Sequence, residues 1–202
     1  NYAANAGWPV MASGFNGERA TPGKYNGLVS LTNPGGRANW HDRGPVRIRN
    51  VTDGTSNTAA VAERLIQAAG SLDEVKSSEN RRLSFHVTSS SARTLPQMAA
   101  AGDPGATHAD ARDSAFVGRA WISGWSSTGP TYMHLMPPNT NHCHFSMADK
   151  NGNVAITPSS NHPGGVHVLM ADGHVHFVND DVEQVTWWAM GSRDGGDLPG
   201  GS

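Results

Sequence analysis

Two runs near the C-terminus alternate apolar and polar side chains at every second position. They cover residues 166–171 and 174–178, and Asp172 and Gly173 lie between them. A period of two is typical of a half-buried strand, and Asp-Gly between two such runs indicates a hairpin with a two-residue type I′ turn. The pattern therefore predicts a β-hairpin over residues 166–178.

A two-residue turn would fix which side chains face one another across this hairpin. Met170 would lie opposite Val175, so that apolar side chains share one face and histidines share the other. The apolar face would hold Val166, Val168, Met170, Val175 and Phe177, and the opposite face His167, His174 and His176. We expect the apolar face to belong to the core.

Weaker periodic patterns predict four further elements. These are strands over residues 46–51, 118–125 and 131–136 and a short amphipathic helix over residues 181–190. Residues 59–69 are ambiguous, because their alanine content favours a helix whereas a strand through Ala59 to Glu63 also fits. Both alternatives stay open from the residues alone.

Turn-forming residues separate these elements. The chain has 24 glycines and 12 prolines among 202 residues, which favours many short elements over a helix bundle. Residues 1–45 form a loop-rich N-terminal stretch, and the small polar residues 88–112 predict a long exposed loop. We expect a single β-rich α+β domain over residues 1–202.

Composition excludes two classes of partner. With 15 Lys and Arg against 17 Asp and Glu, the formal net charge is -2, so no positive excess attracts nucleic acid or anionic lipid. No segment approaches the run of about 20 apolar residues that crosses a bilayer. We expect neither nucleic-acid binding nor a membrane span in this chain.

Cys143 is the single cysteine of the chain, so it has no internal disulfide partner. Either it is a small buried residue, or its partner lies outside these residues. Both interpretations predict that Cys143 is not a reactive thiol.

Two groups of residues have the chemistry of metal ligands. His174 and His176 have the i, i+2 spacing that places two imidazoles on one face of a strand, a weak candidate for a transition-metal pair. Oxygen ligands suited to calcium come from Asp180, Asp181, Asp194 and Asp197, although their spacing matches no EF-hand loop. Solvated turn carboxylates explain the same acidic residues without an ion.

His162 and Asp172 have side chains that cooperate in acid–base catalysis in many enzymes. Turn geometry already explains Asp172 with Gly173, and His162 is placed to hold a loop by hydrogen bonds. No nucleophile motif accompanies them, so we expect no enzymatic activity. A sugar-stacking role for Trp187 or Trp188 competes with core packing.

Four blocks occur in a fixed order along the chain. His162 is followed by nine residues and then by Asp172 and Gly173, and three other blocks accompany this spacing. They are residues 51–58 with Glu63 after them, Pro137-Pro138-Asn139 with Cys143, and residues 191–197. Together they resemble the H-x9-DG signature of a large prepilin-like family of unknown function, abundant in planctomycete-type bacteria. The signature residues are His162, Asp172, Gly173, Asp53, Gly54, Asn57 and Glu63, and residues 159–199 carry the C-terminal hairpin and helix.

The resemblance implies a pilin-like head with an antiparallel sheet, short helices and long loops, similar to type IV pilins and type II secretion pseudopilins. Such proteins begin with a cleavage site and a long hydrophobic helix, which this chain lacks, so the resemblance implies that the pilin helix lies outside it. It also implies a strand at residues 58–63 and an earlier cysteine that would pair with Cys143 in an oxidising compartment.

The function implied is that of a structural or assembly subunit of an extracellular pilus-like filament, secreted through a prepilin-type pathway. The subunit would contact other copies through a surface that includes its N-terminal edge, where the missing segment or a neighbour's strand would fit. The alternative is a cell-surface binding module for a glycan, a small ligand or a metal ion. No cofactor is required, and calcium is an option for fixing a C-terminal loop.

Overall fold

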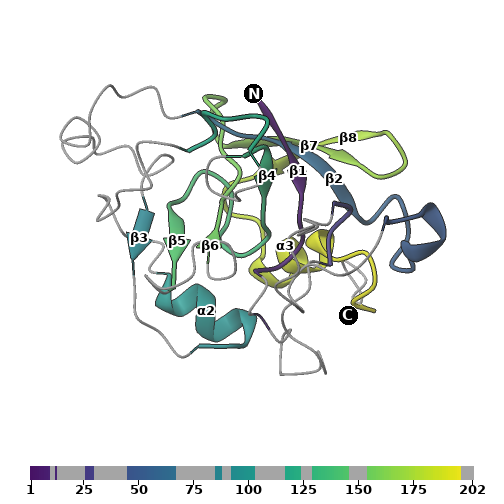
Figure 1. Ribbon diagram of the computed structural model, residues 1–202, viewed down its shortest axis with the longest axis horizontal. Helices are drawn as coiled ribbons and strands as arrows, with labels where there is room; N and C mark the ends of the chain where they lie inside the picture. Colours follow the sequence, from purple (N-terminus) through teal and green to yellow (C-terminus); the bar gives the residue numbers. More distant parts are fainter. Residues whose placement is uncertain are drawn as a thin grey trace.

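The computed structural model describes residues 1–9, 12, 26–29, 45–66, 85–87, 92–102, 117–123, 129–145 and 154–196. Within these ranges the chain forms two β-sheets, two α-helices and one 3-10 helix (Figure 1). The predicted β-rich α+β class is confirmed. No helix in the described ranges is long and apolar enough to cross a membrane.

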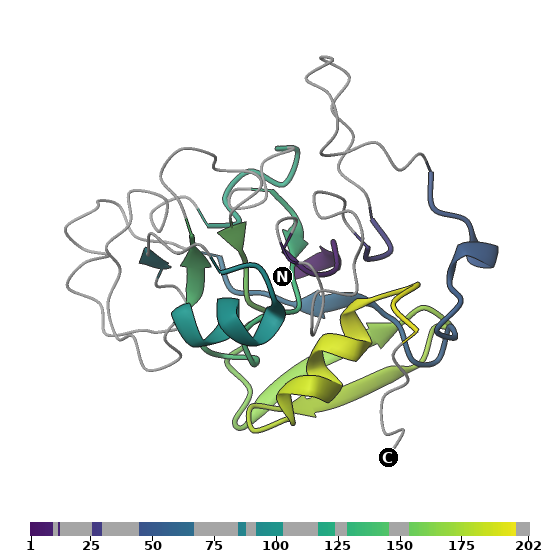
Figure 2. The same ribbon diagram turned by 90° about the horizontal axis from the view of Figure 1, so that it is seen from below.

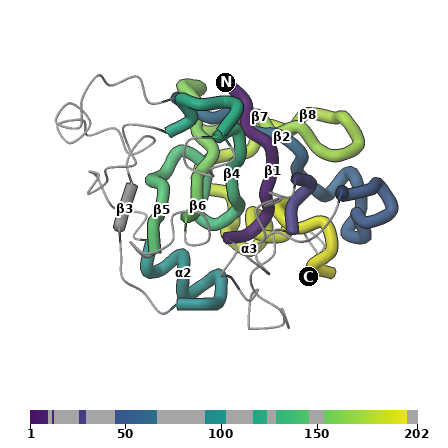
Figure 3. The backbone as a smooth tube through the Cα atoms, viewed as in Figure 1, coloured from purple at the N-terminus to yellow at the C-terminus, as the bar shows by residue number. Residues whose placement is uncertain are grey.

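The larger sheet has five strands in the order β4-β1-β2-β7-β8. Their bounds are Tyr2–Asn5 for β1, Ala59–Glu63 for β2, Thr131–Tyr132 for β4, Gly165–Met170 for β7 and Val175–Asn179 for β8. The pairing is antiparallel except between β1 and β4. Strand β1 lies between β2 and β4 (Figure 3), so residues expected to be loop provide an interior strand.

The smaller sheet has the order β3-β5-β6, with β3 at Phe85–Val87, β5 at His142–His144 and β6 at Val154–Ala155. Helix α2 (Leu95–Ala101) lies beside it (Figure 1). The exposed loop predicted for residues 88–112 is therefore wrong for this segment. Thr94 caps the helix by accepting a hydrogen bond from the backbone N–H of Gln97. Leu95 and Met98 are buried, so this segment has apolar contacts despite its many small polar residues.

Helix α3 (Gln184–Gly191) covers one face of strands β7 and β8 (Figure 2). Trp187 and Trp188 are both buried, and the indole of Trp188 donates a 2.8 Å hydrogen bond to the carbonyl of Leu135. Core packing therefore accounts for both tryptophans, and the predicted C-terminal helix is confirmed with slightly different bounds.

Three of the weaker strand predictions need correction. Residues 46–51 contain a 3-10 helix, Ile48–Asn50, because Asn50 bonds back to Arg47 through both its backbone and its side chain. The described part of 118–125 consists of turns and irregular chain, and of 131–136 only Thr131–Tyr132 is a strand. Residues 59–63 form a strand, as the resemblance implied.

The C-terminal hairpin exists, but its loop has three residues rather than two. The Met170 N–H donates to the carbonyl of His174 at 2.8 Å, and the Gly173 N–H donates to the carbonyl of Met170 at 3.0 Å. Gly173 has φ +97°, the left-handed conformation that closes a three-residue hairpin loop. The loop is held from outside, because Ala171 donates to the carbonyl of Thr58.

The extra loop residue shifts the register by one and changes which side chains share a face. Leu169 now pairs with Val175, and Val168 pairs with His176. His174 and His176 thus lie on the α3 side with the buried Val168, whereas Val175 is exposed on the opposite side. The predicted burial of Met170 is confirmed, and that of Val175 is wrong.

The face of the large sheet opposite α3, here called the outer sheet face, carries two rows of side chains across its strands. One row is Ala4, Val61, Leu169 and Val175, and the other is Tyr2, Glu63, His167 and Phe177. The second row brings an acidic residue next to a histidine on the neighbouring strand.

Candidate functional site

The signature residues of block 51–58 form a turn that binds the C-terminal segment by hydrogen bonds. The Asp53 carboxylate is buried and accepts hydrogen bonds from the backbone N–H groups of Gly195 and Gly196, at 2.8 and 2.9 Å. Asn57 donates from its side chain to the carbonyl of Asp53, and Gly54 has φ +95°. These three residues therefore form a turn that binds backbone.

Asn139, in the Pro137-Pro138-Asn139 block, joins the start of β7. Its side-chain amide donates to Asp180 at 2.7 Å and to the carbonyl of Gly165 at 3.2 Å, while its side-chain oxygen accepts the N–H of Ser160 at 2.8 Å. Asn139 has φ 60°, a conformation that asparagine tolerates better than most residues. The block thus orders the loop that leads to His162.

Glu63, His162 and His167 form a cluster on the outer sheet face. Glu63 ends β2, His167 lies on the neighbouring β7, and His162 comes from the loop before β7. The His162 Nε2 is 3.0 Å from Glu63 Oε1, and the His167 Nδ1 is 3.2 Å from Glu63 Oε2. The backbone N–H of His167 also donates to Glu63 Oε2 at 2.8 Å. Both carboxylate oxygens are therefore used.

Burial and charge differ within this cluster. The Glu63 side chain is 14% exposed, whereas those of His162 and His167 are 52% and 43% exposed. Partial burial raises the pKa of Glu63, but the hydrogen bonds from His167 and the nearby His162 outweigh it, so the pKa lies below its usual value. The carboxylate is consequently ionised at neutral pH and faces a hollow of about 370 Å³ lined also by Tyr2 and Val61.

Sequence reasoning named Glu63 and His162 as signature residues but missed their contact and the role of His167. Within the described ranges, these three residues are the one group of three or more His, Cys, Asp or Glu side chains whose ligand atoms all lie within 4.8 Å. The contact spans 99 residues of chain between Glu63 and His162. A signal did exist, because both histidines stand near the start of a strongly predicted strand.

Most of the other predicted metal ligands that the structure describes contact other partners. His174 and His176 have ring centroids 4.5 Å apart, but His174 is bound to Asp172 within the hairpin loop. The hydrogen bonds from His174 hold the pKa of Asp172 below its usual value. Asp180 contacts Asn139, Asp194 pairs with the adjacent Arg193 at 3.7 Å, and Asp181 is exposed. Asp197 lies outside the described residues, so the calcium hypothesis stays a prediction.

Comparison with known proteins places this arrangement in a family. A family described as "Protein of unknown function (DUF1559)" matches residues 4–185. The chain belongs to that family. The matched range includes the second half of β1, all the other strands of both sheets and the whole Glu63–His162–His167 cluster. No curated protein and no solved structure matches the chain.

Cys143, within the matched range, is fully buried in the small sheet. Its sulfur lies 3.6 Å from the carbonyl oxygen of Gly102 at the end of α2. Its burial agrees with the small buried residue, and a disulfide with a cysteine outside these residues stays a prediction.

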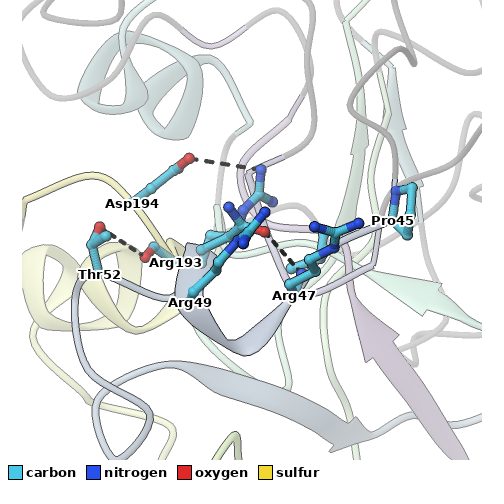
Figure 4. A pocket seen from close by; sticks show the side chains of 8 residues that line it. Pro45, Arg47, Arg49, Thr52, Arg193 and Asp194 are labelled. Carbon is cyan, nitrogen blue, oxygen red and sulfur yellow. Dashed lines mark hydrogen bonds and ion pairs between the residues drawn. The ribbon is translucent and has the colours of Figure 1, made fainter.

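A second concave surface is basic. Three arginines, Arg47, Arg49 and Arg193, line a hollow of about 430 Å³ together with Asp194 (Figure 4). Arg193 is buried and donates to the carbonyl of Gly27, whereas Arg47 and Arg49 are exposed. Guanidinium groups in such a hollow can bind carboxylate or phosphate.

Proposed function

We propose that this member of the DUF1559 family is the β-rich head of a prepilin-like subunit, which assembles with other copies into an extracellular filament. The four sequence blocks support the prepilin-like assignment. The observation that supports assembly is the outer sheet face, which carries apolar side chains and lies opposite the layer formed by α3.

A β-sheet with apolar side chains on both faces is stable when each face packs against another layer. Here α3 covers one face, and the outer face presents Tyr2 at 70%, Val175 at 61% and Phe177 at 45% exposure. Strand β8 is also an edge of this sheet within the described residues. Exposed apolar faces and sheet edges are surfaces on which further chains or segments pack.

The roles of the signature side chains support a structural function as well. Asp53 binds the C-terminal segment, Asp172 binds its own hairpin loop, and Asn139 orders the loop before β7. In each case the polar side chain satisfies the backbone of a distant or turning segment. Such residues maintain a shape, which is what a filament subunit requires.

Replacing Val175 by aspartate tests the assembly surface. The charge would lie in the apolar row of the outer sheet face, and we expect Val175→Asp to shift the protein from oligomers towards monomers in light scattering. The matched control is Val185→Asp, because Val185 is 53% exposed on α3. An assembly that survives Val175→Asp unchanged, or a wild-type protein that stays monomeric at high concentration, contradicts the proposal.

Negative-stain microscopy of native material gives the complementary measurement. We expect ordered fibres in which this chain is the repeating unit. A specific contact between copies should bury at least about 1,000 Å². Cell-surface material that contains the chain only as dispersed particles would count against the filament.

The basic hollow favours a second candidate function, a cell-surface binding module for an acidic glycan. Arg47 and Arg49 present exposed guanidinium groups beside the buried Arg193. Binding of a polyuronate should weaken in Arg49→Gln and stay unchanged in Arg119→Gln, an exposed arginine outside the hollow. Equal binding by both variants would remove this candidate.

A further inference from the structure

We propose that Glu63, His162 and His167 form a binding site for a divalent transition-metal ion of the zinc class. The inference goes beyond the filament proposal, since it rests on the geometry of three side chains and not on contacts between copies. Two imidazoles and one carboxylate are a donor set that suits Zn²⁺.

The distances in the cluster are close to those that a bound ion requires. Zinc bonds of about 2.0–2.1 Å in tetrahedral geometry separate neighbouring ligand atoms by about 3.4 Å. The two nitrogen-to-carboxylate distances are 3.0 and 3.2 Å, and all three ligand atoms lie within 4.8 Å of one another. Changes of a few tenths of an ångström to at most about 1.4 Å in these separations therefore convert the hydrogen-bonded cluster into a coordination shell.

The backbone around the ligands is held before any ion binds. The Glu63 carbonyl accepts the N–H of Ser159 at 3.0 Å, and the His167 N–H holds the Glu63 carboxylate. The His162 N–H donates to the hydroxyl of Ser160, which in turn donates to the carbonyl of Gly165 at 2.7 Å. Such outer contacts orient ligands and reduce the cost of ordering them.

The surroundings leave the site accessible from one side. Glu63 lies beneath the two half-exposed imidazoles, and the hollow in front of them is lined by apolar side chains and Tyr2. Three protein ligands leave the fourth tetrahedral position open towards this hollow, where water or an outside ligand atom can bind. This is the arrangement of a site that binds further molecules, since a closed structural site uses four protein ligands.

Calorimetric titration of the chelator-treated chain with ZnCl2 tests the site. We expect about one ion per chain, and at least about 100-fold weaker binding in His162→Gln and in Glu63→Gln. The matched control is His176→Gln, which removes an exposed imidazole from the other side of the sheet. Substitution by Co²⁺ should give the visible absorption of a four-coordinate ion in the wild type and lose it in His162→Gln.

Three results of these titrations would overturn the proposal. A wild type that does not bind Zn²⁺, or a His162→Gln variant that binds like the wild type, overturns the proposal. Loss of binding in His176→Gln alone would move the site to the His174–His176 pair and overturn it equally. Because His162 is half-exposed, its variant should fold, and thermal unfolding without metal checks this. If Glu63→Gln fails to fold, the His162→Gln variant alone tests the metal site. Every measurement can be made on monomeric protein, so the test does not depend on filament assembly.

Discussion

The carboxylate of Asp53 binds the backbone of Gly195 across 142 residues of chain, with Oδ2 accepting the N–H at 2.8 Å. The second oxygen accepts the N–H of Gly196, and the carbonyl of Arg193 accepts the N–H of Thr52 at 2.8 Å. The segment that follows α3 is thereby attached to the turn before β2. Hydrogen bonds to an ionised carboxylate are about twice as strong as neutral ones.

Replacement of Asp53 by alanine should therefore lower the free energy of unfolding by about 2–4 kcal/mol, because two backbone donors lose a charged acceptor. Urea unfolding monitored by tryptophan fluorescence measures the change. Asp181→Ala provides the control, since Asp181 is exposed, and we expect its unfolding free energy to stay near that of the wild type. Equal stability of the two variants would show that the Asp53 contacts do not support the fold.

Gly173 should be required for its conformation rather than for its small size. A Cβ added at this position meets nothing within 4 Å, yet φ is +97°. Gly173→Val should cost about 1–3 kcal/mol of unfolding free energy, because a β-branched side chain is strained at positive φ. Gly173→Asn should cost less, since asparagine tolerates this region. A valine variant as stable as the asparagine variant would contradict the explanation.

Local sequence patterns predicted the secondary-structure elements that a few neighbouring residues determine. The alternation on both sides of Asp172 predicted the hairpin, and the amphipathic pattern of residues 181–190 predicted a helix that forms as α3. The β-rich class followed from the density of glycine and proline. These features depend little on what packs against them.

The hairpin register could not be predicted, because distant residues decide it. Asp-Gly fits a two-residue turn as well as a three-residue loop, and contacts with Thr55 and Thr58 hold the longer loop. A shift of one residue exchanges the two faces, which explains why Val175 was expected in the core. The burial of α2 is similar, since Leu95 and Met98 need a partner surface that sequence does not show.

The candidate metal cluster was predictable from the sequence only in part. Glu63 and His162 were recognised by their place in sequence blocks, but the pairing of β2 with β7 brings His167 to the same carboxylate across 104 residues. Long-range strand pairing has no local sequence signal. Some residues of the site could thus be identified from the sequence, whereas the contacts between them could not.

Cys143 should resist alkylation in the folded chain and react once the chain is unfolded. Its sulfur is fully buried, and a Cβ added to Gly102 would lie only 2.7 Å from it. Iodoacetamide labelling followed by mass spectrometry measures the rate with and without denaturant. Ser56→Cys supplies an exposed thiol as an internal reference, because Ser56 is exposed. Labelling of Cys143 as fast as that of the reference would contradict a buried role.

Two buried histidines should make the fold sensitive to acid. His134 donates from Nδ1 to the carbonyl of Trp187 at 2.8 Å, and its Nε2 is 3.1 Å from the hydroxyl of Tyr132. His142 accepts the N–H of Thr157 at Nδ1, which requires that nitrogen to be unprotonated. Burial lowers the pKa of each histidine to about 3.

Between the ordinary histidine pKa of about 6.5 and the folded value of about 3, the unfolded chain binds protons that the folded chain excludes. The free energy of unfolding should therefore decrease as the pH is lowered through this window. Each histidine should account for a loss of about 2 kcal/mol between about pH 7 and about pH 5. Urea unfolding with a chelator present measures the slope without any contribution from metal. His134→Gln should reduce the slope by the share of one histidine, whereas the exposed His176→Gln should not change it. The same acid sensitivity in His134→Gln as in the wild type would mean that His134 is not the group that titrates.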